Sequence, residues 1–255
     1  MVSSSRKKNK GRDRKAKKAE TEKRARVRDK WLGWATGEDK FTGAKIQCDH
    51  GCGEIPNDID HPVSKFLDDF VAYRDANANI PLDTGMVMRD ILQTHPQIWN
   101  DDRYREMTIR ILTSMGTNML LIVLGDQDKG TSWAIDMARS IVILECYNAV
   151  AGSLQMALCS QVAALKRRDL YVVSSSRRDA LKFFSKRTAC SCLKKMHQEA
   201  RRTLPNMGVC WGCLEEKKRV SLSVCSKCMT AQYCSRECQV THWPKHDCKR
   251  RYTYS

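Results

Sequence analysis

The sequence predicts a mainly α-helical protein: a helical body, a basic N-terminal arm and a small cysteine-rich module at the C-terminus. First, apolar residues between His61 and about Met196 recur at three- and four-residue steps. Second, residues 1–30 hold 14 Lys or Arg against 4 Asp or Glu and have almost no apolar residues. Third, cysteines after Cys210 recur at metal-binding spacing. We therefore divide the chain into an arm (1–30), a mainly helical domain of unknown role (31–204) and a metal-binding module (205–255).

The N-terminal arm is expected to be disordered or to project from the body. Between about Lys15 and Lys30 it is rich in Ala, Glu, Lys and Arg, so a helix can form, but no apolar stripe would pack it against the body. Its charge would attract nucleic acid through counterion release, or serve as a nuclear-import signal. A solvated tail without a partner is an equally simple interpretation, because basic runs are not specific.

The helical body begins where Trp31 and Trp34 open the apolar pattern. Its 42% apolar composition, taken over the whole chain, allows a real core. Helix starts are predicted at Pro62, Ser132 and Ser176. Breaks are predicted at residues 79–81, 95–96, 125–130 and 152, which gives about five helices. A basic helix from Lys182 to Arg202 should then lead into the C-terminal module, which we expect to dock on it.

The body carries no recognisable catalytic motif. The sequence lacks both a Gly-rich phosphate loop after an apolar strand and a Gly-x-Ser-x-Gly elbow. The adjacent acids at 68–69 and 101–102 fit helix starts, where negative charge complements the helix dipole. The most apolar window, residues 115–124, is too short to span a bilayer. We therefore expect a protein that is not an enzyme and does not enter a membrane.

The C-terminal module is the most specific part of the sequence. It contains two Cys-x-x-Cys pairs, at 210–213 and 225–228, then Cys234 and Cys238, then His246 and Cys248. Paired thiolates at this spacing chelate one metal ion with little loss of chain entropy. The alternatives are disulfides or inert thiols. Disulfides need an oxidising compartment, and no apolar leader precedes the arm, so we expect a nuclear or cytoplasmic location.

The order of these ligands and the residues between them resemble the MYND zinc-finger family over roughly the last fifth of the chain. The resemblance implies two interleaved structural zinc ions and no open catalytic position. One ion would bind Cys210, Cys213, Cys234 and Cys238, and the other Cys225, Cys228, His246 and Cys248. Only Asp247 separates His246 from Cys248, fewer residues than is usual in the family. Either the helix must unwind before Cys248, or His242 must replace one ligand.

The resemblance also implies protein–protein recognition, commonly of short proline-containing peptides in transcriptional regulators. Gln239 and Trp243 match the family's contact positions, although Trp243 as core packing is an equally open interpretation. The segment from Met229 to Tyr233 could pair with an extended peptide. The leading hypothesis is therefore an adaptor that recruits a protein partner. The alternative is a nucleic-acid-binding protein that uses the basic arm and the basic finger. Some lysine methyltransferases carry this finger, but their signatures are missing here.

A further metal site is conceivable within residues 31–204. Its candidate ligands are Cys48, His50, Cys52, His61, Cys190 and Cys192. Their spacing matches no common zinc knuckle, so we favour a glycine-containing loop with ordinary thiols.

Overall fold

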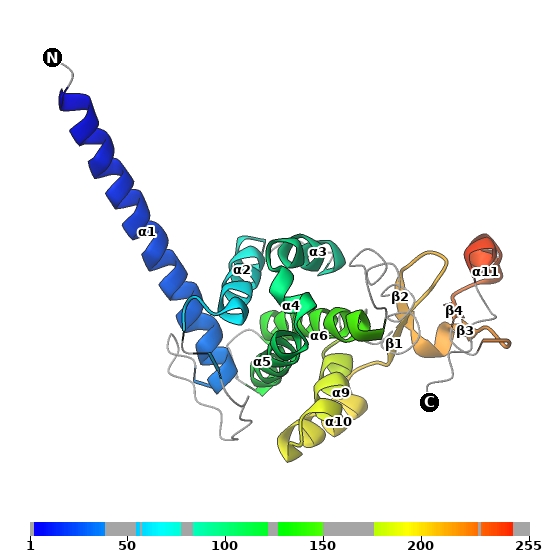
Figure 1. Ribbon diagram of the computed structural model, residues 1–255. Helices are drawn as coiled ribbons and strands as arrows, with labels where there is room; N and C mark the ends of the chain where they lie inside the picture. The colour runs from blue at the N-terminus through cyan, green and yellow to red at the C-terminus, as the bar shows by residue number, and fades with distance from the viewer. Residues whose placement is uncertain are drawn as a thin grey trace.

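The computed structural model describes residues 3–38, 55–56, 58–77, 84–121, 127–149, 176–228 and 231–246. Over these ranges the chain is mainly helical, and a small module with short strands follows the helices, as the sequence predicts (Figure 1). None of the helices in these ranges combines the length and the apolar character needed to cross a lipid bilayer.

Helix α1 (Ser3–Thr36) contains both the basic arm and the first residues of the core. Residues 12–26 are exposed and the helix projects from the body (Figure 1). Trp31, near its other end, is fully buried, and its Nε1 donates to Asp68 Oδ1 at 2.6 Å. The arm therefore projects as the continuation of a helix whose other end is buried in the body.

The C-terminal end of α1 is capped by side chains of another helix. The last carbonyls of a helix have no partner within it and need one elsewhere when they are buried. Ser114 Oγ donates to the carbonyl of Ala35 at 2.9 Å, and Asn118 Nδ2 donates to that of Trp34 at 2.7 Å. Both donors lie one turn apart on α5 (Asp102–Leu121), so this contact fixes the direction in which the arm leaves the body.

Six further helices lie within the described part of the body, and most of their boundaries follow the predicted signals. They are α2 (Pro62–Ala76), α3 (Thr84–Thr94), α4 (Pro96–Asn100), α6 (Gln127–Ala149), α9 (Arg177–Arg187) and α10 (Ser191–Thr203). The predicted starts at Pro62 and Ser176 are confirmed. The start at Ser132 is wrong, because α6 already runs through Gly130 and Ser132. A glycine costs a helix only about 1 kcal/mol, which packing can offset.

The expected basic helix from Lys182 to Arg202 is in fact two helices. Helix α9 ends at Arg187, and α10 begins at Ser191 after an extended Thr188. Cys190 is the N-cap of α10, and its Sγ accepts from the amide of Leu193 at 3.5 Å. Helix α9 packs on α5 where the Phe184 ring lies directly over Gly116. This close approach needs glycine, because a Cβ at position 116 would collide with the ring.

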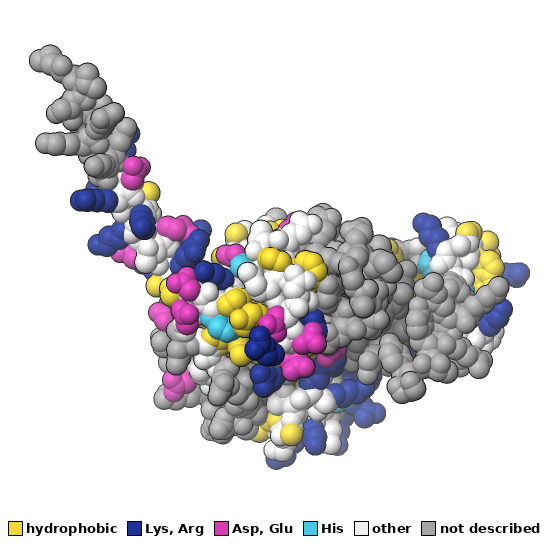
Figure 2. All heavy atoms as spheres, viewed as in Figure 1, with side chains coloured by type: hydrophobic (Ala, Val, Ile, Leu, Met, Phe, Trp, Pro, Cys, Tyr) yellow, Lys and Arg dark blue, Asp and Glu magenta, His cyan; other side chains and the backbone are white. Residues whose placement is uncertain are grey.

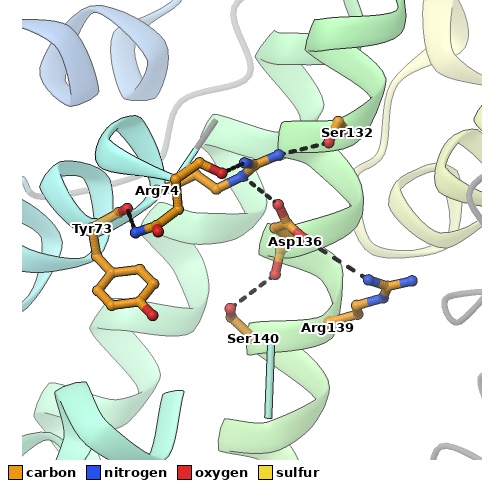
Figure 3. A network of polar contacts seen from close by, with 7 residues as sticks. Tyr73, Arg74, Ser132, Asp136, Arg139 and Ser140 are labelled. Carbon is orange, nitrogen blue, oxygen red and sulfur yellow. Dashed lines mark hydrogen bonds and ion pairs between the residues drawn. The ribbon is translucent and has the colours of Figure 1, made fainter. Parts of the chain in front are cut away.

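A buried polar network joins α2 to α6 (Figure 3). Arg74 Nε lies 2.6 Å from Asp136 Oδ2, and both side chains are less than a tenth exposed. Arg74 Nη2 also donates to Ser132 Oγ at 2.7 Å, and the guanidinium lies over the Trp133 ring. Burial of this pair is tolerable because each charge has the opposite charge beside it, and Arg74 also donates to Ser132.

Candidate metal centres

Two short hairpins and one helix form the scaffold of the C-terminal module. Strand β1 (Met207–Val209) pairs antiparallel with β2 (Glu216–Lys218), and β3 (Ser223–Val224) pairs with β4 (Gln232–Tyr233). The 3₁₀ turn η1 (Arg219–Ser221) joins β2 to β3, and α11 (Arg236–His242) follows β4. Cysteines stand at the ends of these elements. The first Cys-x-x-Cys pair follows β1, the second follows β3, and Cys234 follows β4.

The structure brings together Cys210, Cys213, Cys234 and Cys238 in one cluster. Their sulfur atoms all lie within 4.8 Å of one another. The Sγ atoms of Cys213 and Cys234 are 3.8 Å apart, and those of Cys234 and Cys238 are 3.5 Å apart. Cys238 comes from the first turn of α11, whose N-cap Ser235 accepts from the Cys238 amide at 3.2 Å. These are the four residues that the resemblance assigns to one ion.

The spacing of this cluster fits a tetrahedral zinc ion. With Zn–S bonds of about 2.3 Å, tetrahedral angles put two sulfur ligands about 3.8 Å apart. The two sulfur–sulfur distances, 3.8 and 3.5 Å, lie within 0.3 Å of this value. They are also far longer than an S–S bond of about 2.05 Å, and the cysteines are free thiols. The donor set is therefore that of a structural zinc site.

The electrostatics of the cluster also call for a cation. Burial alone would raise the pKa of the Cys210 thiol, but the backbone N–H groups of Cys213, Cys234 and Gly212 point at its sulfur and lower the pKa to about 6. The neighbouring sulfurs of Cys210 and Cys238 raise the pKa of Cys234 to about 12. One thiolate is thus stabilised by amides, while a second beside it is opposed by its neighbours. A bound cation removes this conflict by ionising every coordinating thiol.

A second cluster contains Cys225, Cys228 and His246, whose ligand atoms also lie within 4.8 Å of one another. Cys228 Sγ lies 3.6 Å from His246 Nε2, close to the roughly 3.5 Å expected for a sulfur and a nitrogen on one tetrahedral zinc. The 3₁₀ turn η2 (Trp243–Lys245) ends before His246, which has an extended backbone. This is the unwinding that the short spacing to Cys248 predicts. Cys248 itself lies outside the described residues.

His242 is not a member of either cluster. It is buried, and its Nδ1 lies 3.1 Å from the hydroxyl of Tyr233. The buried ring of Tyr233 packs with Cys210, Leu222, Cys225 and Ala231 in a small core between the two clusters. The structure therefore gives His242 a packing role that the sequence left open.

The other sequence-predicted ligands do not meet in the part of the chain that the structure describes. His61 is the N-cap of α2, and its Nδ1 accepts from the amide of Val63. Cys190 caps α10, and neither it nor Cys192 belongs to a cluster of metal-ligating atoms among the described residues. Cys48, His50 and Cys52 lie outside those residues.

Gln239 and Trp243 are one helical turn apart in sequence; Gln239 is partly buried and Trp243 is 50% exposed. Val240, beside Gln239 on α11, is 63% exposed. Trp243 is thus not buried in the core, although its ring contacts that of His246. The expected peptide-pairing edge at Met229 to Tyr233 is wrong for residues 231–233. Cys225 N donates to the Ala231 carbonyl, and Trp211 N donates to the Gln232 carbonyl, so both sides of this strand are already paired.

Comparison with protein families agrees with this geometry. The family model described as "MYND finger" matches residues 210–249, which contain both clusters. The C-terminal module is therefore a zinc finger of the MYND type, a class generally involved in protein–protein interaction. No curated protein and no solved structure matches the chain.

Proposed function

We propose that this protein is a non-enzymatic adaptor whose MYND finger recognises a short peptide of a partner protein. The observation that carries the proposal is the half-exposed Trp243 on the outer face of the finger. A large aromatic side chain left in water is unusual outside binding surfaces, and Trp is enriched among the residues that dominate binding energy. In this proposal the finger holds two zinc ions, one in each cluster, and Cys248 is the fourth ligand of the second.

The proposed peptide site is the face formed by Gln239, Val240 and Trp243. Val240 and Trp243 offer apolar surface. The Gln239 side-chain amide can donate a hydrogen bond to the peptide main chain and accept one from it. Pairing in the manner of an added strand at residues 231–233 is not available, because both sides of that segment are bonded. The finger would therefore bind the peptide through side chains, with Trp243 stacked on an apolar or proline side chain of the peptide. Such a partner would be found in the nucleus or cytoplasm.

The test compares two variants of the zinc-loaded full chain against an array of short proline-containing peptides. Trp243→Ala should weaken binding at least tenfold, because loss of a central aromatic contact typically costs about 2 kcal/mol or more. Val220→Ala is the matched control: Val220 is 92% exposed on the same finger, in η1. It should bind as the parent does. Retained binding in Trp243→Ala, with zinc content equal to the parent, would refute the proposal.

A second candidate function is nucleic-acid binding through the arm. The supporting observation is that residues 12–26 of α1 are all exposed and hold most of their charge as Lys and Arg. Phosphate contacts of this kind fix position without reading sequence. The arm variant Lys15→Gln/Lys18→Gln/Lys23→Gln tests it in the salt titration described below.

A further inference from the structure

A dense positive surface lies on the body, away from the projecting part of the arm. Helices α9 and α10 together carry nine Lys or Arg and only two acidic residues, Asp179 and Glu199. Lys and Arg side chains gather over these helices at the lower edge of the molecule (Figure 2). We define the basic surface by six residues: Arg178, Lys182, Lys186, His197, Arg201 and Arg219.

The basic surface is assembled from three elements. On α9, Arg178, Lys182 and Lys186 follow at steps of four residues and so share one face, about 6 Å apart along the axis. His197 and Arg201 show the same step on α10, which packs beside α9. Arg219 comes from η1 of the finger. Arg178 Nη1 donates to the carbonyl of Leu204 at 3.2 Å, which ties α9 to the segment that enters the finger.

The positive charges on this surface repel one another. The pKa of Lys182 is lowered by burial and then by Lys186, Arg219 and Arg178, while Asp179 acts in the opposite direction. The pKa of His197 is lowered by burial and then by Arg201, Lys182, Arg178 and Lys186. Asp179 is buried and Glu199 is exposed. Like charges held this close destabilise the folded chain, and a bound polyanion would relieve that repulsion.

We propose that the basic surface binds the phosphate backbone of a nucleic acid. Regular steps of about 6 Å suit a ligand with many evenly repeated charges better than one isolated carboxylate. The large exposed apolar side chains of the described residues lie outside α9 and α10, so neither helix offers the apolar face that membrane insertion or a peptide groove requires. The proposal does not rest on peptide recognition by Trp243, which lies in η2 of the finger.

The experiment measures binding of the zinc-loaded full chain to fluorescein-labelled 20-mer duplex DNA and single-stranded RNA. Fluorescence anisotropy is recorded at several salt concentrations. The test variant is Lys186→Gln/Arg201→Gln/Arg219→Gln, in which all three residues are exposed. Its matched control is Lys65→Gln/Arg103→Gln/Arg110→Gln, which removes the same charge from exposed positions elsewhere on the body. Circular dichroism and zinc content confirm that each variant is folded.

The test variant should lose at least tenfold in affinity. The slope of log K against log salt should become shallower by about 2 to 3 on duplex DNA, because three phosphate contacts are lost. The body control should keep the slope of the parent. Any change of slope in the arm variant should add to the change in the test variant, so the contributions of the arm and of the basic surface can be told apart. Comparison of the DNA and RNA probes tells which backbone is preferred.

Two results would overturn the proposal. One is a test variant that binds both probes with the affinity and salt slope of the body control. The other is tighter binding of fluorescein-labelled poly-glutamate than of either nucleic acid by the parent, with that tighter binding lost in the test variant, which would assign the surface to an acidic protein. If the triple variant does not fold, Lys186→Gln and Arg219→Gln should each reduce the slope by about one, and unchanged slopes would refute the proposal.

Discussion

At the scale of single residues, the first metal cluster depends on a glycine that carries no ligand. A Cβ added at Gly212 would lie 2.6 Å from Cys238 Cβ and as close to the Cys238 main chain. Because these atoms belong to the backbone and to a ligand, they cannot swing aside as a flexible side chain would. The Cys-Trp-Gly-Cys knuckle therefore needs glycine at its third position for close packing against α11.

Gly212→Ala should weaken metal binding at the first cluster. Crowding of this kind costs about 1–3 kcal/mol, which corresponds to roughly a 5- to 150-fold loss of zinc affinity. Competition with a chromophoric chelator measures that affinity. Gly208→Ala is a close control, since its added Cβ would meet the movable ends of Gln232 and Leu222. Equal zinc affinity in both variants would contradict the steric argument.

Sequence reasoning performs best where residue identity alone fixes the chemistry. Paired cysteines identify metal ligands before any fold is known, and a proline or serine identifies a helix start, as at Pro62 and Ser176. It fails where long-range packing decides. No local signal indicates that the Tyr233 hydroxyl contacts the His242 ring. Nor does one indicate that Ser114 and Asn118 cap a helix some eighty positions earlier. At Gly130 a local signal misleads: the glycine predicts a break, but α6 continues through it.

At the scale of elements, the pair Arg74–Asp136 holds α2 against α6. Arg74→Met would remove the guanidinium that compensates the buried Asp136 carboxylate. The more distant Arg139, whose Nη1 lies 3.9 Å from Asp136 Oδ1, would remain. Loss of one partner of a buried pair is strongly destabilising, so we expect a decrease of about 3 kcal/mol in the free energy of unfolding.

Urea denaturation of the full chain, followed by circular dichroism, measures this loss. Arg103→Met is the control, because Arg103 pairs with Asp101 at the surface, where an ion pair contributes little. The double variant Arg74→Met/Asp136→Leu should regain part of the stability, since no charge then stays buried. A single variant as stable as the control would show that the pair does not hold the two helices together.

At the scale of the whole molecule, the body and the finger are stabilised by different means. The body has an extensive apolar core, whereas the finger core is a few side chains between two clusters of ligands. A segment this small needs metal to fold, so its folding free energy is largely that of metal binding.

Addition of EDTA should therefore unfold residues 205–255 and leave the helical body folded. Far-ultraviolet circular dichroism should keep most of its helical signal, while the finger amides lose their protection from hydrogen exchange. Cys234→Ala should give the same pattern without chelator, since the Cys234 sulfur lies 3.8 Å from that of Cys213 and 3.5 Å from that of Cys238. A single transition that removes body and finger together would show that the two fold as one unit.

The continuity of α1 across the edge of the body has a mechanical consequence. A helix of 34 residues is about 51 Å long, and its last turns are fixed by Trp31 and by the two caps from α5. A flexible tail would let a ligand sample the whole surface of the molecule, including the finger. A helix fixed at one end instead holds whatever binds along the arm at a set distance and bearing from the body.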